Sequence, residues 1–229
     1  FQSWLGESTA LLPHIQRTLE KKSLPTDLAY IAMIESGFSA TAISSAKAVG
    51  YWQFMKATGQ RYGLKSNWWL DERRDFKKST EAAASYLGDL YKMFGSWYLT
   101  AAAYNMGEGR LRRLIKKHKT KDFWKLSKKR DFPKETRDYI PKLLAAVMMA
   151  KMPKLYGLKH KTKRRTPYEY FYAPGGLDLA NLASFMKQDR EKLMKLNPAL
   201  VKGFIPKTVA GYWIRLPKGK SSRASAFVR

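Results

Sequence analysis

Residues 28–38 read Leu-Ala-Tyr-Ile-Ala-Met-Ile-Glu-Ser-Gly-Phe. Apolar side chains, Ile31 and Ile34 among them, recur at the spacing of a helical face. Gly37 interrupts the run, because glycine commonly ends a helix. The stretch therefore predicts a buried helix that carries Glu35 at its C-terminal end.

The helical pattern continues from this stretch to about residue 156, and strand-like alternation is absent there. Further helices are predicted over residues 80–91, 98–104, 108–116 and 134–152. The expected core face of the last one consists of Leu143, Leu144, Val147 and Met148. Residues 1–158 are therefore predicted to form one all-helical domain.

The pattern changes after residue 158. A basic linker is predicted over 159–167, and a β-α-α-β module over 168–217. Its strands are expected at 168–172 and 212–216, its helices at 177–186 and 189–196, and a frayed basic tail at 218–229. The predicted fold class is mainly α, with a small α+β module at the C-terminal end.

The composition limits the classes of function. The net charge of +26 attracts polyanions, among which nucleic acid, anionic lipid and the carboxylate-rich bacterial wall are all candidates. The absence of cysteine excludes disulfides, thiolate metal sites and cysteine nucleophiles. His14, His118 and His160 lie far apart in the sequence, so we expect no metal site and no cofactor. The apolar run 143–150 is too short to span a bilayer.

Glu35 is the first candidate for chemistry. Its apolar neighbours, Ile31, Ile34 and Phe38, penalise a carboxylate and so raise its pKa, which suits a general acid that protonates a glycosidic oxygen. The alternative is a solvated glutamate at a helix end, which is the more common case.

Aromatic residues are the second signal. Flat aromatic faces suit sugar rings, although packing in a core is the more common role of such residues. In residues 102–109, Ala-Ala-Tyr-Asn-Met-Gly-Glu-Gly, two glycines break one helix before the next begins. This segment is either part of a site or a plain helical corner. The aromatic set consists of Tyr51, Trp52, Trp68, Trp69, Trp97, Tyr98 and Tyr104.

Three motifs occur in a fixed order: Glu35-Ser36, then Gly50-Tyr-Trp-Gln53, then Ala103-Tyr-Asn105. Together they resemble the family 1 lytic transglycosylases, which are glycoside hydrolases of the soluble lytic transglycosylase and goose-type lysozyme kind. The resemblance spans about residues 24–158 and is strongest to the membrane-bound lytic murein transglycosylase D branch. It implies a lysozyme-like catalytic domain that cleaves the β-1,4 bond between N-acetylmuramic acid and N-acetylglucosamine in peptidoglycan.

The resemblance also implies residue roles. Glu35 would be the single catalytic acid and base, and the acetamido group of the substrate would replace the usual second carboxylate. The product would then be a 1,6-anhydromuropeptide. The implied substrate-binding residues are Ser44, Tyr51, Trp52, Gln53, Met55, Tyr104, Asn105, Glu135 and Tyr139. The family usually has Gly-Leu-Met-Gln at residues 50–53, so the preference for sugars at individual subsites stays open.

The C-terminal module resembles a divergent LysM repeat through Leu193-Met-Lys-Leu-Asn-Pro198 and its element order. A packing module without affinity for glycan is the alternative. The expected partner is the peptidoglycan glycan strand, with association with the wall or outer-membrane surface as a further option. We expect a monomer, no nucleic acid, and a periplasmic or secreted location for a processed chain, since no export signal is visible.

Alternative functions remain open on the sequence. A hydrolytic lysozyme would use the same residues if water reached C1 of the sugar, and its preference could extend to de-N-acetylated glycan. A non-catalytic protein that binds the wall or another polyanion would keep the fold alone. Nucleic-acid binding is suggested by the pI of about 10.2, but no recognised nucleic-acid-binding motif accompanies the charge.

Overall fold

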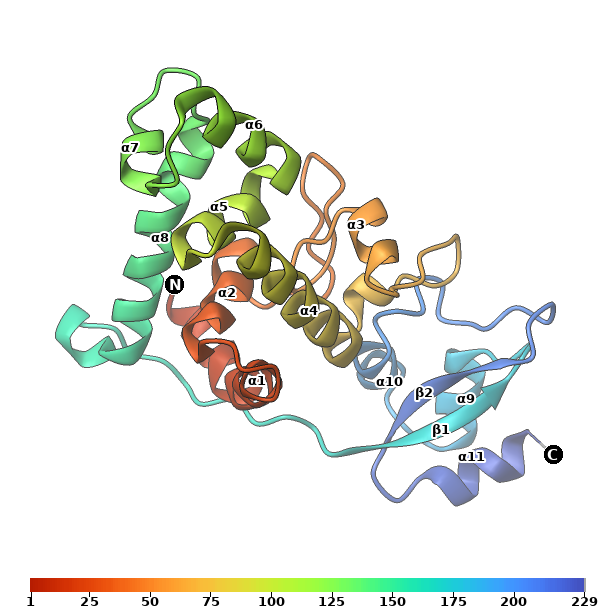
Figure 1. Cartoon of the computed structure of the whole chain (residues 1–229). Helices are drawn as coiled ribbons and strands as arrows, with labels where there is room; N and C mark the ends of the chain where they lie inside the picture. Colours follow the sequence, from red (N-terminus) through yellow and green to blue (C-terminus); the bar gives the residue numbers. More distant parts are fainter. Residues whose placement is uncertain (229) are drawn as a thin grey trace. The chain divides into compact units, whose positions relative to one another are not determined.

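The computed structural model describes residues 1–228, which form two compact units. The first combines residues 1–38 with 80–163, and the second combines 39–79 with 164–228. The chain therefore enters the second unit twice (Figure 1). The domain boundaries predicted from the sequence, at residues 158, 167 and 217, stay a prediction.

The first unit is built from helices alone, apart from its loops. Gly37 ends α2 in the left-handed conformation with φ +60°, as its sequence predicts. The α-helices are α1 (Gln2–Glu20), α2 (Tyr30–Ser36), α4 (Phe76–Phe94), α5 (Trp97–Met106), α6 (Glu108–His118), α7 (Phe123–Ser127) and α8 (Lys134–Lys151). Helix α4 belongs to this unit from Thr80 onwards. The 3-10 turns are η1 (Thr26–Ala29) and η3 (Pro153–Tyr156).

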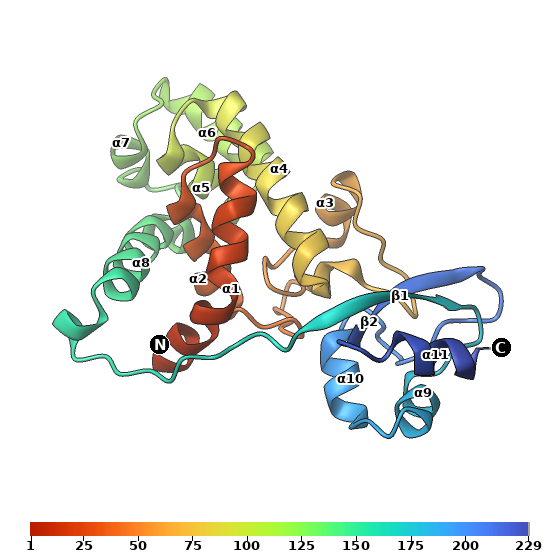
Figure 2. The same ribbon diagram turned by 90° about the horizontal axis from the view of Figure 1, so that it is seen from below.

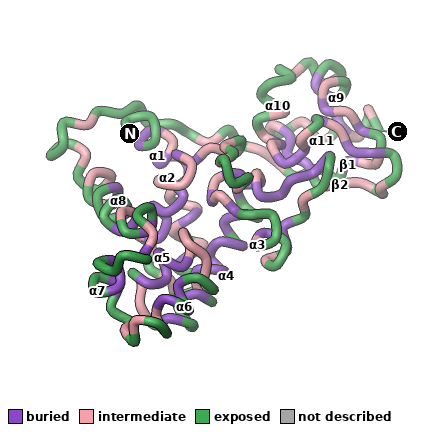
Figure 3. Tube along the Cα trace, turned by 90° about the horizontal axis from the view of Figure 1, so that it is seen from above, coloured by how far each residue is buried: buried purple, intermediate pink, exposed green. Residues whose placement is uncertain are grey.

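Helix α5 lies at the centre of this unit, packed against both α6 and α8, and α2 also packs on α8. The middle of α5, from Leu99 to Ala103, is buried, because three successive alanines allow neighbouring helices to approach closely. Figure 3 shows the same burial along the trace of α5. The packing of α2 against α8 brings Glu35, near the end of α2, within hydrogen-bonding distance of Tyr139 on α8.

The core face of α8 differs from the predicted one. The buried residues of α8 are Thr136, Tyr139, Ile140, Leu143 and Ala146. Of the predicted face only Leu143 is buried, Val147 is half-buried, and Leu144 and Met148 are 40% and 49% exposed. The reason is helical geometry: each residue turns the helix by about 100°, so Leu144 lies on the stripe beside Leu143.

The second unit contains an antiparallel hairpin and short helices (Figure 2). Tyr168 pairs with Pro217 at one end of the hairpin and Pro174 with Gly211 at the other. The elements are β1 (Tyr168–Pro174), α9 (Leu179–Phe185), α10 (Arg190–Leu196), β2 (Gly211–Pro217), α11 (Ser221–Phe227), and, from the earlier segment, α3 (Lys56–Arg61), η2 (Glu72–Arg74) and the start of α4. The predicted strand-helix-helix-strand order is confirmed, whereas α11 occupies most of the segment expected to be a frayed tail.

One apolar core serves both chain segments of the second unit. It contains Leu182, Leu193 and Ile214 from the C-terminal segment, all fully buried, and Trp69 and Leu70 from the earlier segment. Leu70 also forms an isolated β-bridge with Leu200. Residues 164–228 therefore pack as a continuous structure with the segment that precedes α4.

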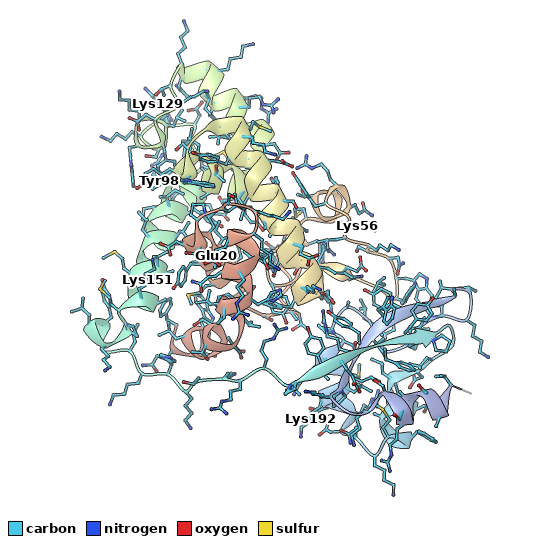
Figure 4. The ribbon with its side chains drawn as sticks, turned by 60° about the horizontal axis from the view of Figure 1, so that its bottom comes forward. Glu20, Lys56, Tyr98, Lys129, Lys151 and Lys192 are labelled. Carbon is cyan, nitrogen blue, oxygen red and sulfur yellow. The ribbon has the colours of Figure 1, made fainter. Side chains whose placement is uncertain are left out.

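Charged side chains cover the surface of both units. Lys129 and Lys151 are exposed in the first, and Lys56 and Lys192 in the second (Figure 4). Among the helices of residues 1–228, none has the length and hydropathy that a bilayer span requires. The excess of positive charge is thus distributed over both units.

Gly50 provides a test of the loop before α3. Its φ is +82°, and a Cβ there would lie 2.1 Å from the carbonyl oxygen of Arg73. We expect Gly50→Ala to lower the free energy of unfolding by more than about 1 kcal/mol, because both the backbone angle and the space exclude a side chain. Thermal and urea unfolding measure the change.

Gly109, within α6, is the matched control. Apart from its chain neighbours and the nearby backbone of its own helix, no described heavy atom lies within 4 Å of a Cβ built there, and its φ is not in the positive range. Gly109→Ala should raise stability by about 0.5–1 kcal/mol, because alanine loses less backbone entropy in a helix. Equal destabilisation by the two substitutions would contradict the constraint at Gly50.

Candidate active site

Glu35 lies one residue before the end of α2, where the half-buried carboxyl group meets α8. The hydroxyl of Tyr139, a residue of α8 that is 7% exposed, donates a hydrogen bond of 2.6 Å to Glu35 Oε1. Ile31 and Met33 on the same short helix are fully buried. The carboxyl group is thus oriented by one neutral donor in a largely apolar setting.

This setting raises the pKa of Glu35 to about 7. Burial is the main cause, because it disfavours the charged carboxylate. The hydrogen bond from Tyr139 lowers the pKa, and the negative charge of Glu135 raises it. At neutral pH a large fraction of Glu35 therefore carries a proton and can act as an acid.

Two tyrosines accompany Glu35: Tyr139 is buried and Tyr104 is half-buried. Burial and the charge of Glu35 raise the pKa of both Tyr104 and Tyr139 well above the ordinary value, so both phenols stay neutral. The Tyr104 ring lies 5.4 Å from that of Tyr86, whose hydroxyl donates to Glu108 Oε2 at 2.9 Å. The tyrosines next to the carboxyl group can therefore donate hydrogen bonds without adding charge.

Asn105 and Glu135 form a polar cluster in the same unit. Thr136 Oγ1 donates to Asn105 Oδ1 at 2.6 Å, and Asn105 Nδ2 donates to Glu135 Oε1 at 3.2 Å. Thr136 is buried at the start of α8. Because both polar atoms of the Asn105 side chain are engaged, the orientation of Glu135 is defined, and its exposed carboxylate acts on Glu35 through its charge.

The other predicted site residues lie in a loop of the second unit. Ser44 Oγ accepts a hydrogen bond of 3.0 Å from the amide of Ala48. Gln53 has φ +48°, and its Nε2 donates to the carbonyl oxygens of Ala42 at 3.2 Å and Gly50 at 2.9 Å. Side-chain hydrogen bonds and an uncommon backbone angle thus define the shape of this loop.

The aromatic and sulfur-containing residues of the loop differ in exposure. Tyr51 is half-buried with its ring 5.2 Å from that of Phe76, and Met55 is 46% exposed. Trp52 is fully buried, which favours a packing role over the predicted contact with sugar. The structure thus brings Glu35, Tyr104, Asn105, Glu135 and Tyr139 together in one unit, and Ser44 to Met55 together in the other.

Sequence reasoning did not assign roles to Tyr86, Glu108, Thr136 or Arg73. Thr136 directly follows Glu135, and the stretch Arg73-Arg74-Asp75 also resembles the membrane-bound lytic murein transglycosylase D branch, so both had a signal in the sequence. Tyr86 and Glu108 are 22 residues apart, and no local pattern indicates their hydrogen bond. Within residues 1–228, no group of three or more His, Asp or Glu side chains could hold a metal ion.

Comparison with known proteins gives an independent assignment. The sequence profile of the transglycosylase SLT domain matches residues 13–127. The chain is 36% identical over 208 residues to the membrane-bound lytic murein transglycosylase D of Escherichia coli K12, covering 87% of this chain and 44% of that protein. It therefore spans less than half the length of this relative.

Solved structures agree on the fold. The 70 kDa soluble lytic transglycosylase of Escherichia coli is 26% identical with a TM-score of 0.52, over 63% of this chain and 24% of that one. An inactive mutant of the lytic transglycosylase Slt from Pseudomonas aeruginosa is 24% identical with a TM-score of 0.51, over the same shares of the two chains, and supports the fold alone. On the matched half of its sequence and on its helical fold, this chain belongs to the transglycosylase SLT domain family.

Proposed function

We propose that this protein is a lytic transglycosylase that cleaves the β-1,4 bond between N-acetylmuramic acid and N-acetylglucosamine in peptidoglycan. The observation that carries the proposal is Glu35, a carboxyl group oriented by Tyr139 whose pKa is raised by burial to about 7. The relatives described above are named lytic transglycosylases, and one of them a murein transglycosylase. A protonated carboxyl group at neutral pH is the group that a glycosidic leaving oxygen needs.

In the proposed reaction Glu35 donates its proton to the glycosidic oxygen, and the bond from that oxygen to C1 breaks. The carbonyl oxygen of the 2-acetamido group stabilises C1. The carboxylate of Glu35 then takes the proton of the muramyl O6 hydroxyl, and O6 bonds to C1. The product is a 1,6-anhydro sugar, no water is consumed, and Glu35 ends protonated as it began.

The remaining site residues have supporting roles in this proposal. Tyr139 orients Glu35, and Tyr104 contributes a neutral phenol beside it. Ser44 and Gln53 would contact the substrate, with Ser44 near the acetamido oxygen. Glu135 is the alternative second carboxylate, but its hydrogen bond with Asn105 favours a role as a substrate contact and as a charge that adjusts the pKa of Glu35.

The hydrolytic lysozyme remains the alternative. It requires water to reach C1 in place of O6, and a preference for de-N-acetylated glycan would remove the acetamido group from the mechanism. We further propose action as a monomer on glycan strands in the periplasm or after secretion, with LysM-like glycan binding by residues 168–217. The positive charge of both units suits a wall that bears carboxylates.

Digestion of purified sacculi, acetylated and chemically de-N-acetylated, tests the proposal when the products are identified by mass spectrometry. Anhydromuropeptides from the acetylated wall are the expected result, and Glu35→Gln should release them about two to four orders of magnitude more slowly. Muropeptides with a reducing end would identify a lysozyme, and faster digestion of the de-N-acetylated wall would contradict the acetamido mechanism. Inactivity of the wild type on every wall would leave a binding protein.

The pH profile of kcat/KM provides a second test. Because Glu35 must be protonated to act as an acid, we expect activity to fall as the pH rises through about 7. Tyr139→Phe removes a hydrogen bond that lowers the pKa of Glu35, so the fall should move to higher pH. Glu135→Gln removes a negative charge that raises this pKa, so the fall should move to lower pH.

Rates on soluble glycan strands between about pH 5 and 9 measure these shifts. The two substitutions serve as controls for each other, because a general loss of structure would not move the profile in opposite directions. Shifts in the same direction would contradict the assignment of the limb to Glu35.

A further inference from the structure

The loop that carries Ser44 and Gln53 is tied to one arginine. Arg73 Nη1 donates to the carbonyl oxygens of Lys47 at 3.2 Å and Phe54 at 3.0 Å. These two acceptors lie on either side of Gln53 and its strained backbone angle. A single guanidinium group thus bridges two points of the loop and limits its conformations.

Arg73 is in turn oriented by Asp71. Its Nε and Nη2 donate to the two oxygens of the Asp71 carboxylate at 2.9 and 2.7 Å, and both side chains are more than 90% buried. A two-point contact of this kind fixes the plane of the guanidinium, which a lysine could not reproduce. The position of Asp71 therefore determines the position of the loop.

The backbone around Asp71 is paired with the C-terminal segment. The amide of Asp71 donates to the carbonyl oxygen of Ala199 at 2.8 Å, and the amide of Val201 donates to that of Trp69 at 2.9 Å. Leu70 and Leu200 form the bridge between these bonds. Residues 69–71 and 199–201 thus pair as two short extended stretches.

Side chains of β2 add two further connections. Arg215 Nη2 donates to both oxygens of Asp75 at 2.8 and 2.6 Å, and Tyr212 Oη donates to Glu72 Oε1 at 2.8 Å. Glu72 Oε2 in turn accepts from the amide of Lys65 at 2.8 Å. Asp71, Glu72 and Asp75 enclose Arg73 in the sequence, so the C-terminal segment holds this turn at three points.

We infer that residues 164–228 hold the substrate loop, residues 42–54, in position. They do so through residues 199–201, Asp71 and Arg73. The inference rests on the proposed function, which gives Ser44 and Gln53 their role as substrate contacts. Arg73 and Asp71 are positioning residues, because they act through the loop. A separately tethered glycan-binding module would need none of the buried hydrogen bonds that join the two segments.

Amide hydrogen exchange tests the positioning independently of activity. Arg73→Lys keeps the charge and loses the two-point contact, so we expect protection of the amides in 42–54 to fall at least about tenfold. Tyr212→Phe, which removes the hydrogen bond donated to Glu72 and the one accepted from Lys78, should give a smaller fall in the same amides. Lys195→Met, which breaks the exposed pair with Glu191 in the C-terminal segment, should leave them unchanged.

Activity provides the second measurement. Arg73→Lys should lower kcat/KM on glycan strands about tenfold or more while the basic limb of its pH profile, which reports Glu35, stays in place. Free guanidinium added to Arg73→Ala should restore part of the lost activity. A global fall in melting temperature with unchanged relative protection of 42–54 would overturn the inference, as would unchanged protection in both Arg73→Lys and Tyr212→Phe.

The two proposals can fail separately. A wild type that cleaves no glycan, with protection of 42–54 still dependent on Arg73 and Tyr212, would contradict the proposed function and support the positioning. An active wild type whose loop is equally protected in all variants would support the function and overturn the positioning. If Arg73→Lys does not fold, Tyr212→Phe alone decides, because it retains every buried charge.

Discussion

Glu35→Gln is expected to lower the rate of peptidoglycan cleavage by about two to four orders of magnitude. Glutamine can still accept the hydrogen bond from Tyr139, so the packing of α2 against α8 should persist. It has no acidic proton for the leaving oxygen and no carboxylate to receive one from the O6 hydroxyl. Release of soluble muropeptides from sacculi at about pH 6 measures the loss, with thermal unfolding to show that the fold is intact.

Glu20→Gln is the matched control for this prediction. Glu20 is an exposed residue at the end of α1 in the same unit (Figure 4), so the same chemical change there should leave the rate unaltered. A Glu35→Gln protein within about threefold of the wild type would contradict the assignment of the general acid. In that case Glu135, whose charge acts on both Glu35 and Tyr139, would become the residue to replace.

Arg215→Met is expected to reduce the free energy of unfolding by about 3–5 kcal/mol. The substitution keeps an unbranched side chain of similar length but leaves the carboxylate of Asp75, whose side chain is 10% exposed, without its counter-charge. Removal of one partner of a buried ion pair costs more than the pair itself contributes. Urea unfolding followed by circular dichroism measures the change.

Two further variants separate this effect from a loss of packing. Asp75→Asn in the Arg215→Met background removes the uncompensated charge, so stability should recover in part. Glu191→Gln breaks the pair with Lys195, in which both side chains are about 80% exposed, and should change stability by less than about 0.5 kcal/mol. An Arg215→Met protein as stable as Glu191→Gln would show that the buried pair is not needed.

Local patterns in the sequence predicted much of the fold. The end of α2 at Gly37, the helices α4, α5, α6 and α8 and the strand-helix-helix-strand order all follow from spacing, glycine positions and turn residues, whereas α7 was not predicted. The helix α1 was not predicted: it contains Pro13 and has no side-chain cap at its start. The predicted core face of α8 was wrong at Leu144 and Met148, because these exposed residues are as apolar as the residues that are buried.

The candidate site depended on a different kind of information. Periodicity alone favoured a solvated glutamate at position 35, and only the joint occurrence of three motifs pointed to a site. The partner of Glu35 lies 104 residues away in Tyr139, and that of Asp75 lies 140 residues away in Arg215. Pairs at this separation are set by tertiary packing, which the local sequence does not encode.

The order in which the chain is made bears on how the second unit forms. Residues 39–79 are synthesised before their partners on β2. Arg215, for example, is made 140 residues after its partner Asp75. At typical rates of synthesis this delay is on the order of ten seconds. During that interval Trp69 and Leu70 have no apolar partner from the C-terminal segment.

All residues of the first unit are synthesised before β1 begins, because the last of them is Lys163. We therefore expect the nascent chain to fold its helical unit first and to keep residues 39–79 available for chaperones until β2 appears. The loop with Ser44 and Gln53 would then acquire its shape last. A chain released before Arg215 is made would have a formed Glu35 environment and an unformed loop at residues 42–54, so we expect it to be inactive on glycan strands.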